Sequence, residues 1–369
     1  MRIGRLAVAA CLFLDLSCRR EDSARAETTP APVAAKPSAS EAPAPFVPKK
    51  GDFNASAMGT NVHFIAYTTP ELGEAKLDAA MQAALHEIER IEGLMTSWRD
   101  TSEIGRVNLS QGRPTHVSDE TYRVLEKSRW ASELSDGKFD VTFHALSDLW
   151  GFWTDARHTP KLPDPKLVAQ QKAFVDYRKV SLDPSLHEVT LPKGMTIDLG
   201  GIAKGYAVGQ AAEVLKKAGV TSFLVQAGGD LYGAGKKPDG SPWVSGIQDP
   251  RGPRGQFFAT IELGDHAFST AGDYEHFFIL KGKRYHHIID PATGYPATAC
   301  RSVTVWAGDA FTADAIDDAV FILGPEKGLA LVESLPDVGA VIVDAKNKVW
   351  VSKRLVGKVH VTREPTNGI

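Results

Sequence analysis

The hydrophobic positions of this chain recur with two periods, and the longer period predicts helices. Between residues 77 and 95 apolar side chains return every three or four positions, which predicts one long amphipathic helix. A second helix is expected from Ser118, a typical capping residue, to about Leu134. A third helix follows a glycine-rich turn and runs from about Gly205 to Lys217.

The shorter period predicts strands. Residues 53–67 alternate between apolar and polar, which predicts a single strand with Met58-Gly59-Thr60 near its start. Further runs predict strands at 223–226, 243–248, 258–263 and 302–306 and a hairpin at 340–352. Helices and strands are mixed without regular alternation, so the pattern favours an α+β fold over a doubly wound parallel sheet.

The first fifty residues follow neither period. Residues 1–18 carry two arginines and then a short apolar stretch, the layout of a secretory signal peptide. Cys18 resembles the lipid-modified cysteine of bacterial lipoproteins, although Asp15 stands where that pattern has an aliphatic residue; plain secretion is the alternative. Residues 19–50 are rich in alanine and proline, which predicts a disordered tether. We therefore expect a folded domain over residues 51–369, on the periplasmic side of the cell envelope and held to a membrane by lipid.

Composition narrows the class of protein. The formal net charge is −3 and no block of Lys and Arg occurs, which excludes a typical nucleic-acid-binding protein. No run of about 20 apolar residues exists, so the sequence predicts no membrane-spanning helix. Cys300 is the single cysteine of the expected domain, and we predict that it is a small buried hydrophobic residue.

The strongest local signal is the segment DLGGIAKGYA, residues 198–207, where an apolar run meets a glycine-rich turn and a helix begins. Glycines let main-chain groups approach a ligand, and a helix start favours anionic oxygens. Lys204 adds a point charge that suits phosphate. The segment matches neither a Walker loop nor a dinucleotide fingerprint. It indicates a phosphate or metal site, or else an ordinary turn with a solvated lysine.

Three carboxylates stand close together in the segment ADAIDDAVF: Asp314, Asp317 and Asp318. On a helix they would share one face, where like charges are unfavourable unless a cation or solvent intervenes. Mg²⁺ takes oxygen ligands of this kind. If the three carboxylates bind a cation, Asp309, five residues before Asp314, is expected to belong to the same acidic site. The alternative is a capping aspartate with solvated neighbours.

Histidines and aromatic residues supply weaker signals. His286 and His287 are adjacent on a predicted strand and point to opposite faces, so at most one serves a site and the other is expected to be exposed. Trp98 and Trp150 lie in segments whose flat side chains suit a planar heteroaromatic ring, or ordinary core packing.

Taken together, these segments resemble the ApbE family, the FAD:protein FMN transferases. The similar blocks follow one another in order from Met58 to Gly324. They are MGT (58–60), MTSWRDTSEIGRVN (95–108), FDVTFHALSDLWGF (139–152), DLGGIAKGYA (198–207), QAGGDLYGAG (226–235), STAGDY (269–274), HHIIDPATGYP (286–296) and ADAIDDAVFILG (313–324). One block would be weak evidence, whereas eight in sequence are highly specific.

The resemblance implies a two-lobed α+β fold of mixed sheets and helices, with FAD in a cleft between the lobes and Mg²⁺ on its pyrophosphate. It implies transfer of FMN from FAD to a threonine or serine hydroxyl of a target protein, with release of AMP. By motif position, the flavin-nucleotide contacts fall on Met58, Thr96, Ser97, Trp98, Phe139, Asp140, Asp198, Lys204 and Ile288. The metal ligands fall on the main-chain carbonyl of Gly201 and on Asp314, Asp317 and Asp318.

Attack of an alcohol on phosphorus needs positioning and charge neutralisation more than covalent help. We expect Lys204 to offset charge on the departing AMP and either His287 or Asp198 to act as the base. Two alternatives stay open: a Mg²⁺-dependent FAD pyrophosphatase, in which water replaces the hydroxyl, and a non-catalytic flavin-binding lipoprotein. The family usually has Thr at the position of Asp318, so this chain carries an additional negative charge beside the expected metal.

Overall fold

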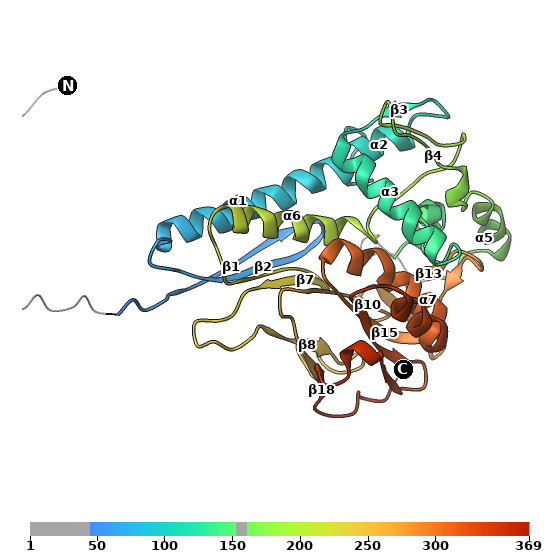
Figure 1. The fold of residues 1–369 in the computed structure, drawn as a ribbon. Coiled ribbons are helices and arrows are strands. Elements are labelled where there is room, and N and C mark those ends of the chain that lie inside the picture. Colours follow the sequence, from blue (N-terminus) through green and yellow to red (C-terminus); the bar gives the residue numbers. More distant parts are fainter. Residues whose placement is uncertain (1–44, 153–160, 369) are drawn as a thin grey trace, which may run out of the picture. The chain divides into compact units, whose positions relative to one another are not determined.

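The computed structural model describes residues 45–152 and 161–368 (Figure 1). The predicted signal peptide and nearly all of the predicted tether lie outside these residues. Phe46–Ile369 is one compact unit. Lys49 already bonds to the folded body, because its backbone N–H donates to the Thr68 hydroxyl at 2.8 Å and its ammonium lies 2.5 Å from the Glu74 carboxylate. The folded unit therefore begins a few residues before position 51.

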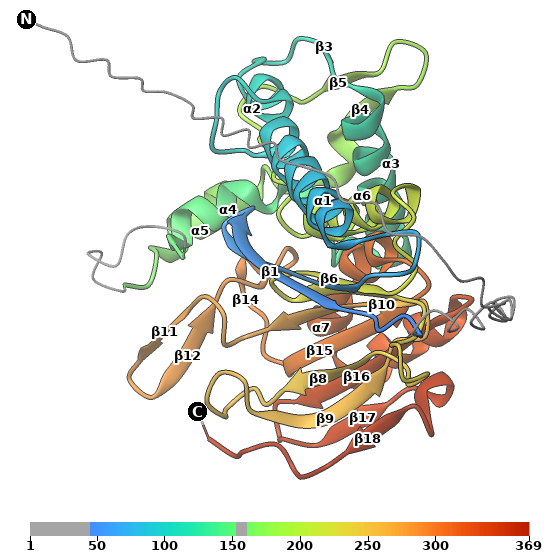
Figure 2. The ribbon, with the colours of Figure 1, turned by 90° about the vertical axis from the view of Figure 1, so that its left-hand side faces the viewer.

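An antiparallel sheet of eight strands organises this unit (Figure 2). Its strands, in spatial order, are β1 (Lys50–Ala57), β2 (Thr60–Tyr67), β6 (Phe223–Ala227), β7 (Asp230–Ala234), β10 (Ala267–Gly272), β15 (Cys300–Ala307), β16 (Val338–Asp344) and β17 (Val349–Val351). Every residue of β15 and β16 is buried. Burial on both sides of a strand requires that other layers cover both faces of the sheet.

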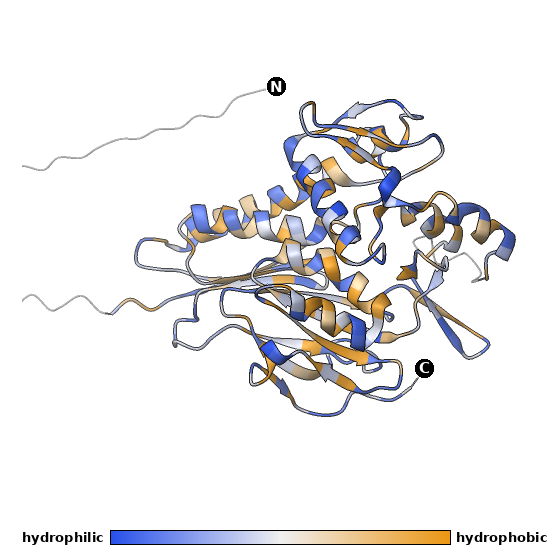
Figure 3. Ribbon diagram, turned by 45° about the vertical axis from the view of Figure 1, so that its right-hand side comes forward, coloured by the Kyte–Doolittle hydropathy of each residue, from blue (hydrophilic) through white to orange (hydrophobic). Residues whose placement is uncertain are grey.

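Three helices form the layer on one face: α1 (Glu74–Met95), α6 (Ala203–Lys217) and α7 (Ala310–Ser334). Figure 3 shows both apolar and polar residues along α1, as expected for a helix half covered by a core, whereas the buried positions of α7 between Ala313 and Phe321 lie on all its sides. Helix α7 is kinked, because Gly324 has φ +79° and Pro325 follows it. Proline cannot donate the next helical hydrogen bond.

A three-stranded sheet covers the other face, in the order β18 (Val359–Val361), β9 (Phe257–Glu262) and β8 (Val244–Gln248). A second apolar core fills the space between the two sheets. It includes Leu231, Trp243, Phe258, Trp306 and Val341, each less than one tenth exposed. The short helix η3 (Lys353–Leu355) leads from β17 to β18.

The second lobe lies between residues 97 and 200 (Figure 1). Its elements are α2 (Glu103–Asn108), β3 (Thr115–His116), α3 (Asp119–Leu134), η1 (Val141–Phe143), α4 (His144–Trp150), α5 (Pro165–Lys172), η2 (Tyr177–Lys179), β4 (Ser181–Asp183) and β5 (Glu188–Thr190). Two small hairpins lie near α4 and α5. They consist of β11 (Phe277–Leu280) with β12 (Lys283–His286), and of β13 (Ile289–Asp290) with β14 (Tyr295–Pro296).

The fold confirms the predicted α+β class and most predicted elements. Helix α3 begins at the predicted cap, where the Ser118 hydroxyl accepts from the Thr121 N–H. The single strand predicted at 53–67 is wrong: β1 and β2 form a hairpin there. Met58 (φ 52°) and Gly59 (φ 70°) make the turn between them. Such a pair of positive φ angles is what a tight hairpin turn requires.

Two further predictions concern the single cysteine of the domain and membrane-spanning helices. Cys300 is buried, as expected, and burial raises the pKa of its thiol to about 12. Among the described residues, no helix combines the length and apolarity that crossing a bilayer requires.

Candidate active site

A cleft of about 1320 Å³ opens between the two lobes. Trp98, Phe139 and Asp198 line it from the second lobe, and Thr270 and Phe257 line it from the two sheets. Its volume exceeds the roughly 300–1,000 Å³ that is usual for small-molecule pockets. All the nucleotide contacts, metal ligands and candidate bases that the resemblance implies line this cleft, whereas Asp309 and Trp150 do not.

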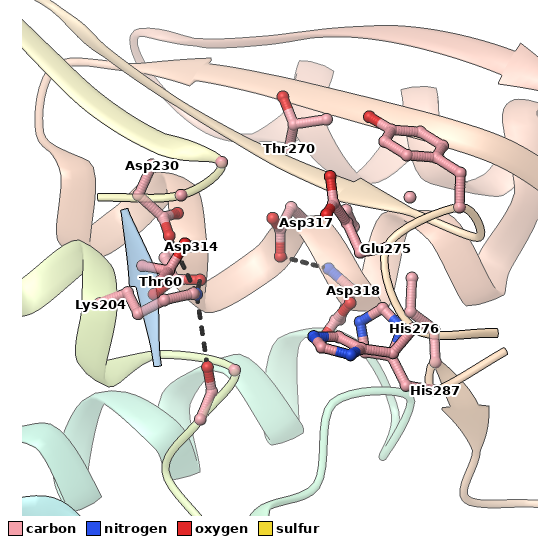
Figure 4. A pocket seen from close by; sticks show the side chains of 18 of the residues that line it. Thr60, Lys204, Asp230, Thr270, Glu275, His276, His287, Asp314, Asp317 and Asp318 are labelled. Carbon is pink, nitrogen blue, oxygen red and sulfur yellow. Dashed lines mark hydrogen bonds and ion pairs between the residues drawn. The ribbon is translucent and has the colours of Figure 1, made fainter. Parts of the chain in front are cut away.

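An acidic cluster of Asp230, Asp314 and Asp317 lies at one side of the cleft (Figure 4). Asp230 opens β7, and the other two project from the second and third turns of α7. Each offers a carboxylate oxygen within 4.8 Å of the others, although all three side chains are at least 95% buried. Three buried like charges this close need a positive partner.

Lys204 supplies one positive charge to this acidic cluster. Its ammonium lies 2.9 Å from Asp230 Oδ2 and 3.4 Å from Asp314 Oδ1. The backbone N–H of Gly205 donates to Asp314 Oδ2 at 2.7 Å. The glycine-rich segment and the acidic segment therefore meet, as predicted, and the alternative of a solvated lysine is wrong.

Glycine at position 205 makes this meeting possible. A Cβ atom there would lie 2.3 Å from the Ala310 carbonyl oxygen and 2.5 Å from Asp314 Cβ. Both distances are shorter than van der Waals contact, so a larger residue would push α6 away from α7. The motif glycine thus sets the distance between the two helices that build the site.

One hydroxyl group serves two members of the acidic cluster. Ser269 on β10 lies within hydrogen-bond distance of Asp230 and, at 2.6 Å, of Asp317 Oδ2. A serine hydroxyl has one proton, so it can donate to only one of these carboxylates at a time. Lys204 and Ser269 together leave the acidic cluster short of positive charge.

The pKa values follow from this shortage. Burial, reinforced by the charge of Asp230, raises the pKa of Asp314 to about 7. Burial also raises the pKa of Asp317, with Asp318 and Asp314 adding to it. Burial alone would lower the pKa of Lys204, but Asp230 and Asp314 outweigh it and raise that pKa. An all-oxygen donor set with excess negative charge fits a hard divalent cation such as Mg²⁺.

Asp318 is a fourth buried acidic residue next to the acidic cluster, and its charge raises the pKa of both Asp317 and Asp314. Its Oδ2 lies 3.2 Å from the position that a Cβ atom would take at Gly201. Its backbone N–H donates to Asp317 Oδ1 at 2.6 Å. Burial raises the pKa of Asp318 to about 6, against the lowering effect of Lys204. Asp318 thus lies between the acidic cluster and the turn at Gly201, and the carbonyl of Gly201 stays a predicted ligand.

Asp309 does not belong to the acidic site. Its carboxylate caps α7, accepting from the Thr312 N–H at 2.7 Å and from the Thr312 hydroxyl at 2.8 Å. The alternative of a capping aspartate is therefore correct at this position. Two hydrogen bonds to the first turn of its own helix explain why it does not point toward the cleft.

The two adjacent histidines are placed differently. His287 lines the cleft, and its ring packs edge-on against His276 with 5.4 Å between centroids. Burial, with the charges of His276 and His286, lowers the pKa of His287 to about 3. The expectation that the other histidine is exposed is wrong. His286 is 3% exposed, bonds to the Ala297 carbonyl at 2.8 Å and packs against Phe321.

The predicted nucleotide contacts differ in what their side chains already bind. Asp140 is buried and accepts from Thr142 and from the Tyr177 N–H, so its carboxylate holds the second lobe together. Asp198 accepts from the Ser97 hydroxyl and, at 2.7 Å, from the Gly200 N–H. Trp98 is 68% exposed at the edge of the cleft, available for stacking.

The remaining predicted contacts lie around the same space. Met58 donates its N–H to Glu92 at 2.8 Å, Thr96 caps the end of α1, and Ile288 is buried at the cleft wall.

The sequence predicts that Trp150 either stacks on a planar ligand or packs in a core. Its indole N–H donates to the Gly294 carbonyl at 2.9 Å and its ring stacks on Phe152. Core packing is correct for this tryptophan.

Sequence reasoning missed several residues of the site: Asp230, Ser269, Glu92 and His276. Asp230 stands in the block QAGGDLYGAG, directly after two glycines that follow a predicted strand. A carboxylate at the end of a glycine turn was a signal that could have been used. Ser269 stands in the block STAGDY, and Glu92 and His276 carry no such local pattern.

The fold and the cleft define a class: a two-lobed α+β protein with a ligand cleft, a lysine and buried carboxylates at one side of it. Comparison with known proteins narrows this class. A model of the ApbE family matches residues 58–342. The chain belongs to the ApbE family.

Relatives and solved structures agree with this assignment. The chain is 33% identical over 288 residues to the FAD:protein FMN transferase of Haemophilus influenzae, covering 75% of this chain and 81% of that protein. The crystal structure of the ApbE protein of Thermotoga maritima superimposes with a TM-score of 0.77 at 31% identity, over 84% of this chain and 99% of that one. The flavin transferase ApbE of Vibrio cholerae superimposes with a TM-score of 0.74 at 27% identity, over 85% of this chain and 100% of that one.

Proposed function

We propose that this protein transfers FMN from FAD to a threonine or serine hydroxyl of a target protein and releases AMP. The observation that carries the proposal is the contact between the glycine-rich turn and the acidic cluster, where Gly205 N–H donates to Asp314. That contact brings a cationic side chain, a helix start and cation-ligating oxygens to one side of the cleft. These are the groups that phosphoryl transfer needs. The family relationship supports the same reaction.

The size of the cleft supports a reaction with two substrates. At about 1320 Å³ it has room beyond that of a typical small-molecule pocket, so a second reactant can enter beside the dinucleotide. The exposed ring of Trp98 and the buried ring of Phe139 offer apolar surfaces for a flavin.

We further propose that the site uses Mg²⁺. Asp314 and Asp317, with Asp230, would hold it, and the resemblance adds Asp318 and the Gly201 carbonyl as ligands. When bound, such an ion neutralises charge on phosphate oxygens. The support for the cation is that the three carboxylates of the acidic cluster share the charge of one lysine, Lys204, and the neutral hydroxyl of Ser269, so negative charge is left uncompensated.

In the proposed reaction the hydroxyl oxygen of the target forms a bond to the FMN-side phosphorus. The bond from that phosphorus to the bridging oxygen breaks, and AMP leaves with that oxygen. Lys204 offsets the charge that develops there. The hydroxyl proton passes to a base of this chain.

Two residues that line the cleft, His287 and Asp198, are the candidates for this base. Both carboxylate oxygens of Asp198 already accept hydrogen bonds, from Ser97 and Gly200. Burial lowers the pKa of His287 to about 3, so its imidazole is neutral at physiological pH and accepts a proton only weakly.

Incubation with FAD and Mg²⁺ and the protein acceptor of the Haemophilus influenzae relative tests the function. Intact-mass spectrometry of the acceptor is expected to show an FMN adduct, and chromatography an equal amount of AMP. Free FMN and AMP without an adduct would instead identify a FAD pyrophosphatase. Intact FAD after long incubation would identify a binding protein. A parallel reaction with EDTA tests the cation.

We also propose that the protein acts at the periplasmic face of the cell envelope, anchored by lipid at Cys18. The support is the sequence pattern of residues 1–18, which lie outside the described part of the chain. Metabolic labelling with a palmitate analogue is expected to mark the full chain and not its Cys18→Ser variant. Equal labelling of both would contradict the anchor.

A further inference from the structure

We infer that the target protein enters the cleft as an extended segment that pairs with the free edge of strand β8. The inference rests on the proposed function, because it identifies where the second substrate of that reaction binds. It assigns a role to a wall of the cleft that no predicted site residue occupies.

Strand β8 is the edge of its sheet. The three strands stand in the order β18, β9, β8, so β9 covers only one side of β8 (Figure 2). The Leu263 N–H donates to the Trp243 carbonyl at 2.9 Å, which fixes the pairing. In an antiparallel ladder, bonded pairs alternate with non-bonded pairs. The N–H and C=O groups of Val244 and Gly246 therefore point away from β9.

These outward backbone groups have no occupant within the described part of the chain. Within the described residues, no hydrogen bond from another residue reaches the backbone of Val244 or Gly246. Unpaired edge groups of this kind are templates for a further strand. Only another extended backbone offers donors and acceptors with the matching period of two residues.

The edge of β8, rather than one of its faces, borders the cleft. Ser245 and Gly246 are neighbours on the strand and their side-chain positions lie on opposite faces, yet both line the cleft. Gln248, at the end of the strand, lines it as well. A guest strand beside β8 would thus lie inside the cleft.

The edge also leads toward the acidic cluster. A bridge between Lys236 and Pro242 joins the end of β7 to the start of β8, and the two strands then separate into different sheets. Asp230 opens β7 and Gln248 closes β8, so both lie at the open end of this pair of diverging strands. A guest segment along β8 would carry its hydroxyl toward the end of the cleft where Asp230 lies.

An exposed aromatic ring, that of Phe257 on β9, lies over one face of β8 at Gly246. A Cβ atom at Gly246 would lie 2.3 Å from the ring of Phe257, so this ring lies flat over the glycine backbone. The ring is 47% exposed. It offers an apolar surface to alternate side chains of a guest strand, while the short edge limits the number of backbone bonds. Such a docking site binds weakly and releases the modified product readily.

A backbone-modified peptide tests the inference. Tandem mass spectrometry of the labelled acceptor locates the modified residue, and a synthetic 13-residue peptide centred on it is the probe. N-methylation of each peptide amide in turn removes one donor at a time. Transfer of FMN is expected to fall about tenfold at every second position and to stay unchanged at the positions between.

A variant of this protein provides a second, independent test of the inference. Val244→Pro removes an outward N–H, whereas the matched control Val244→Thr keeps it. The proline variant is expected to raise the KM for the acceptor about tenfold with unchanged affinity for FAD, which also reports that the variant is folded.

Several results would overturn the inference. An N-methyl scan without alternation would do so, and so would labelling of the whole acceptor but never of the peptide. A concentration-dependent dimer in light scattering that Val244→Pro abolishes would assign the edge to a second copy of this chain. If the acceptor receives no FMN from the wild-type protein, the proposed function itself fails, and this inference with it.

Discussion

Two groups of buried aspartates border the same cleft, and their surroundings are opposite. The acidic cluster of Asp230, Asp314 and Asp317 shares one lysine and one hydroxyl. The second group, which we call the arginine–aspartate network, consists of Arg251, Asp273 and Asp249. There the guanidinium contacts both oxygens of Asp273, at 2.6 and 2.7 Å.

Asp249 shows the difference most clearly. Burial would raise its pKa, but hydrogen bonds from Thr366 and from the Arg251 backbone outweigh burial and lower it. Burial raises the pKa of Asp314 to about 7, because fewer donors oppose it. Burial alone therefore does not distinguish a structural carboxylate from a functional one. The balance of donors against charges does.

The largest expected effect comes from the acidic cluster. Asp314→Asn keeps the size of the side chain and an acceptor for the Gly205 N–H but removes one ligand charge. We expect kcat for FMN transfer to fall about 10²–10³-fold, as for loss of other groups that stabilise transition-state charge. Steady-state kinetics at saturating Mg²⁺ measure this fall.

Asp309→Asn is the matched control for that substitution. It removes a carboxylate from the same helix, but asparagine caps helices about as well as aspartate. Activity and unfolding temperature are expected to stay near those of the wild type. A loss of activity equal to that of Asp314→Asn would show that general charge on α7, rather than the acidic cluster, controls the reaction.

The arginine–aspartate network is expected to respond in stability instead. Arg251→Met leaves the Asp273 carboxylate buried without its main partner, since both side chains are at least nine-tenths buried. Unfolding in urea is expected to show a loss of about 3–5 kcal/mol. The double variant Arg251→Met with Asp273→Leu is expected to recover most of it. A single variant that loses almost nothing would remove the contrast between the two groups.

The sequence predicts those parts of the fold whose signal is local. Helix α3 carries its own cap at Ser118 and its own apolar stripe, and it forms where predicted. The predicted proximity of residues 198–207 and 313–324 is also found in the structure. Each of the two motifs is continuous in sequence and can be recognised locally. The family resemblance supplied the expectation that both bind one ligand and therefore lie close together.

Other features depend on pairing between distant strands, which no local pattern encodes. Asp230 joins the acidic cluster because β7 pairs with β10, which places it beside Ser269. His286 is buried because its ring bonds to the Ala297 carbonyl and packs against Phe321 of α7, not because of its own residue type. The turn at Met58 was missed because its apolar side chain continues the alternation of the strand, although its φ is positive.

A smaller effect is expected in the pH dependence of the arginine–aspartate network. Because the pKa of Asp249 is lowered in the folded state, its contribution to stability is present above the unfolded pKa of about 3.9 and is lost as pH falls through the folded value. Asp249→Asn is expected to cost about 1–3 kcal/mol at pH 7 and progressively less in acid. Urea unfolding of both proteins from pH 7 to pH 3 measures this difference. A constant difference across the range would contradict a charge-dependent role.

The smallest expected effect concerns the boundary of the acidic cluster. Asp318 lies against Gly201, so Asp318→Thr removes a neighbouring charge while Asp230, Asp314 and Asp317 stay in place. Because cation affinity depends on the charge of the ligand set, Mg²⁺ binding is expected to weaken only about threefold to tenfold. Titration calorimetry compares this variant with Asp314→Asn under the same conditions. Equal losses in the two variants would make Asp318 a full member of the acidic cluster, and the cation would then lie between α7 and the turn at Gly201 rather than beside β7.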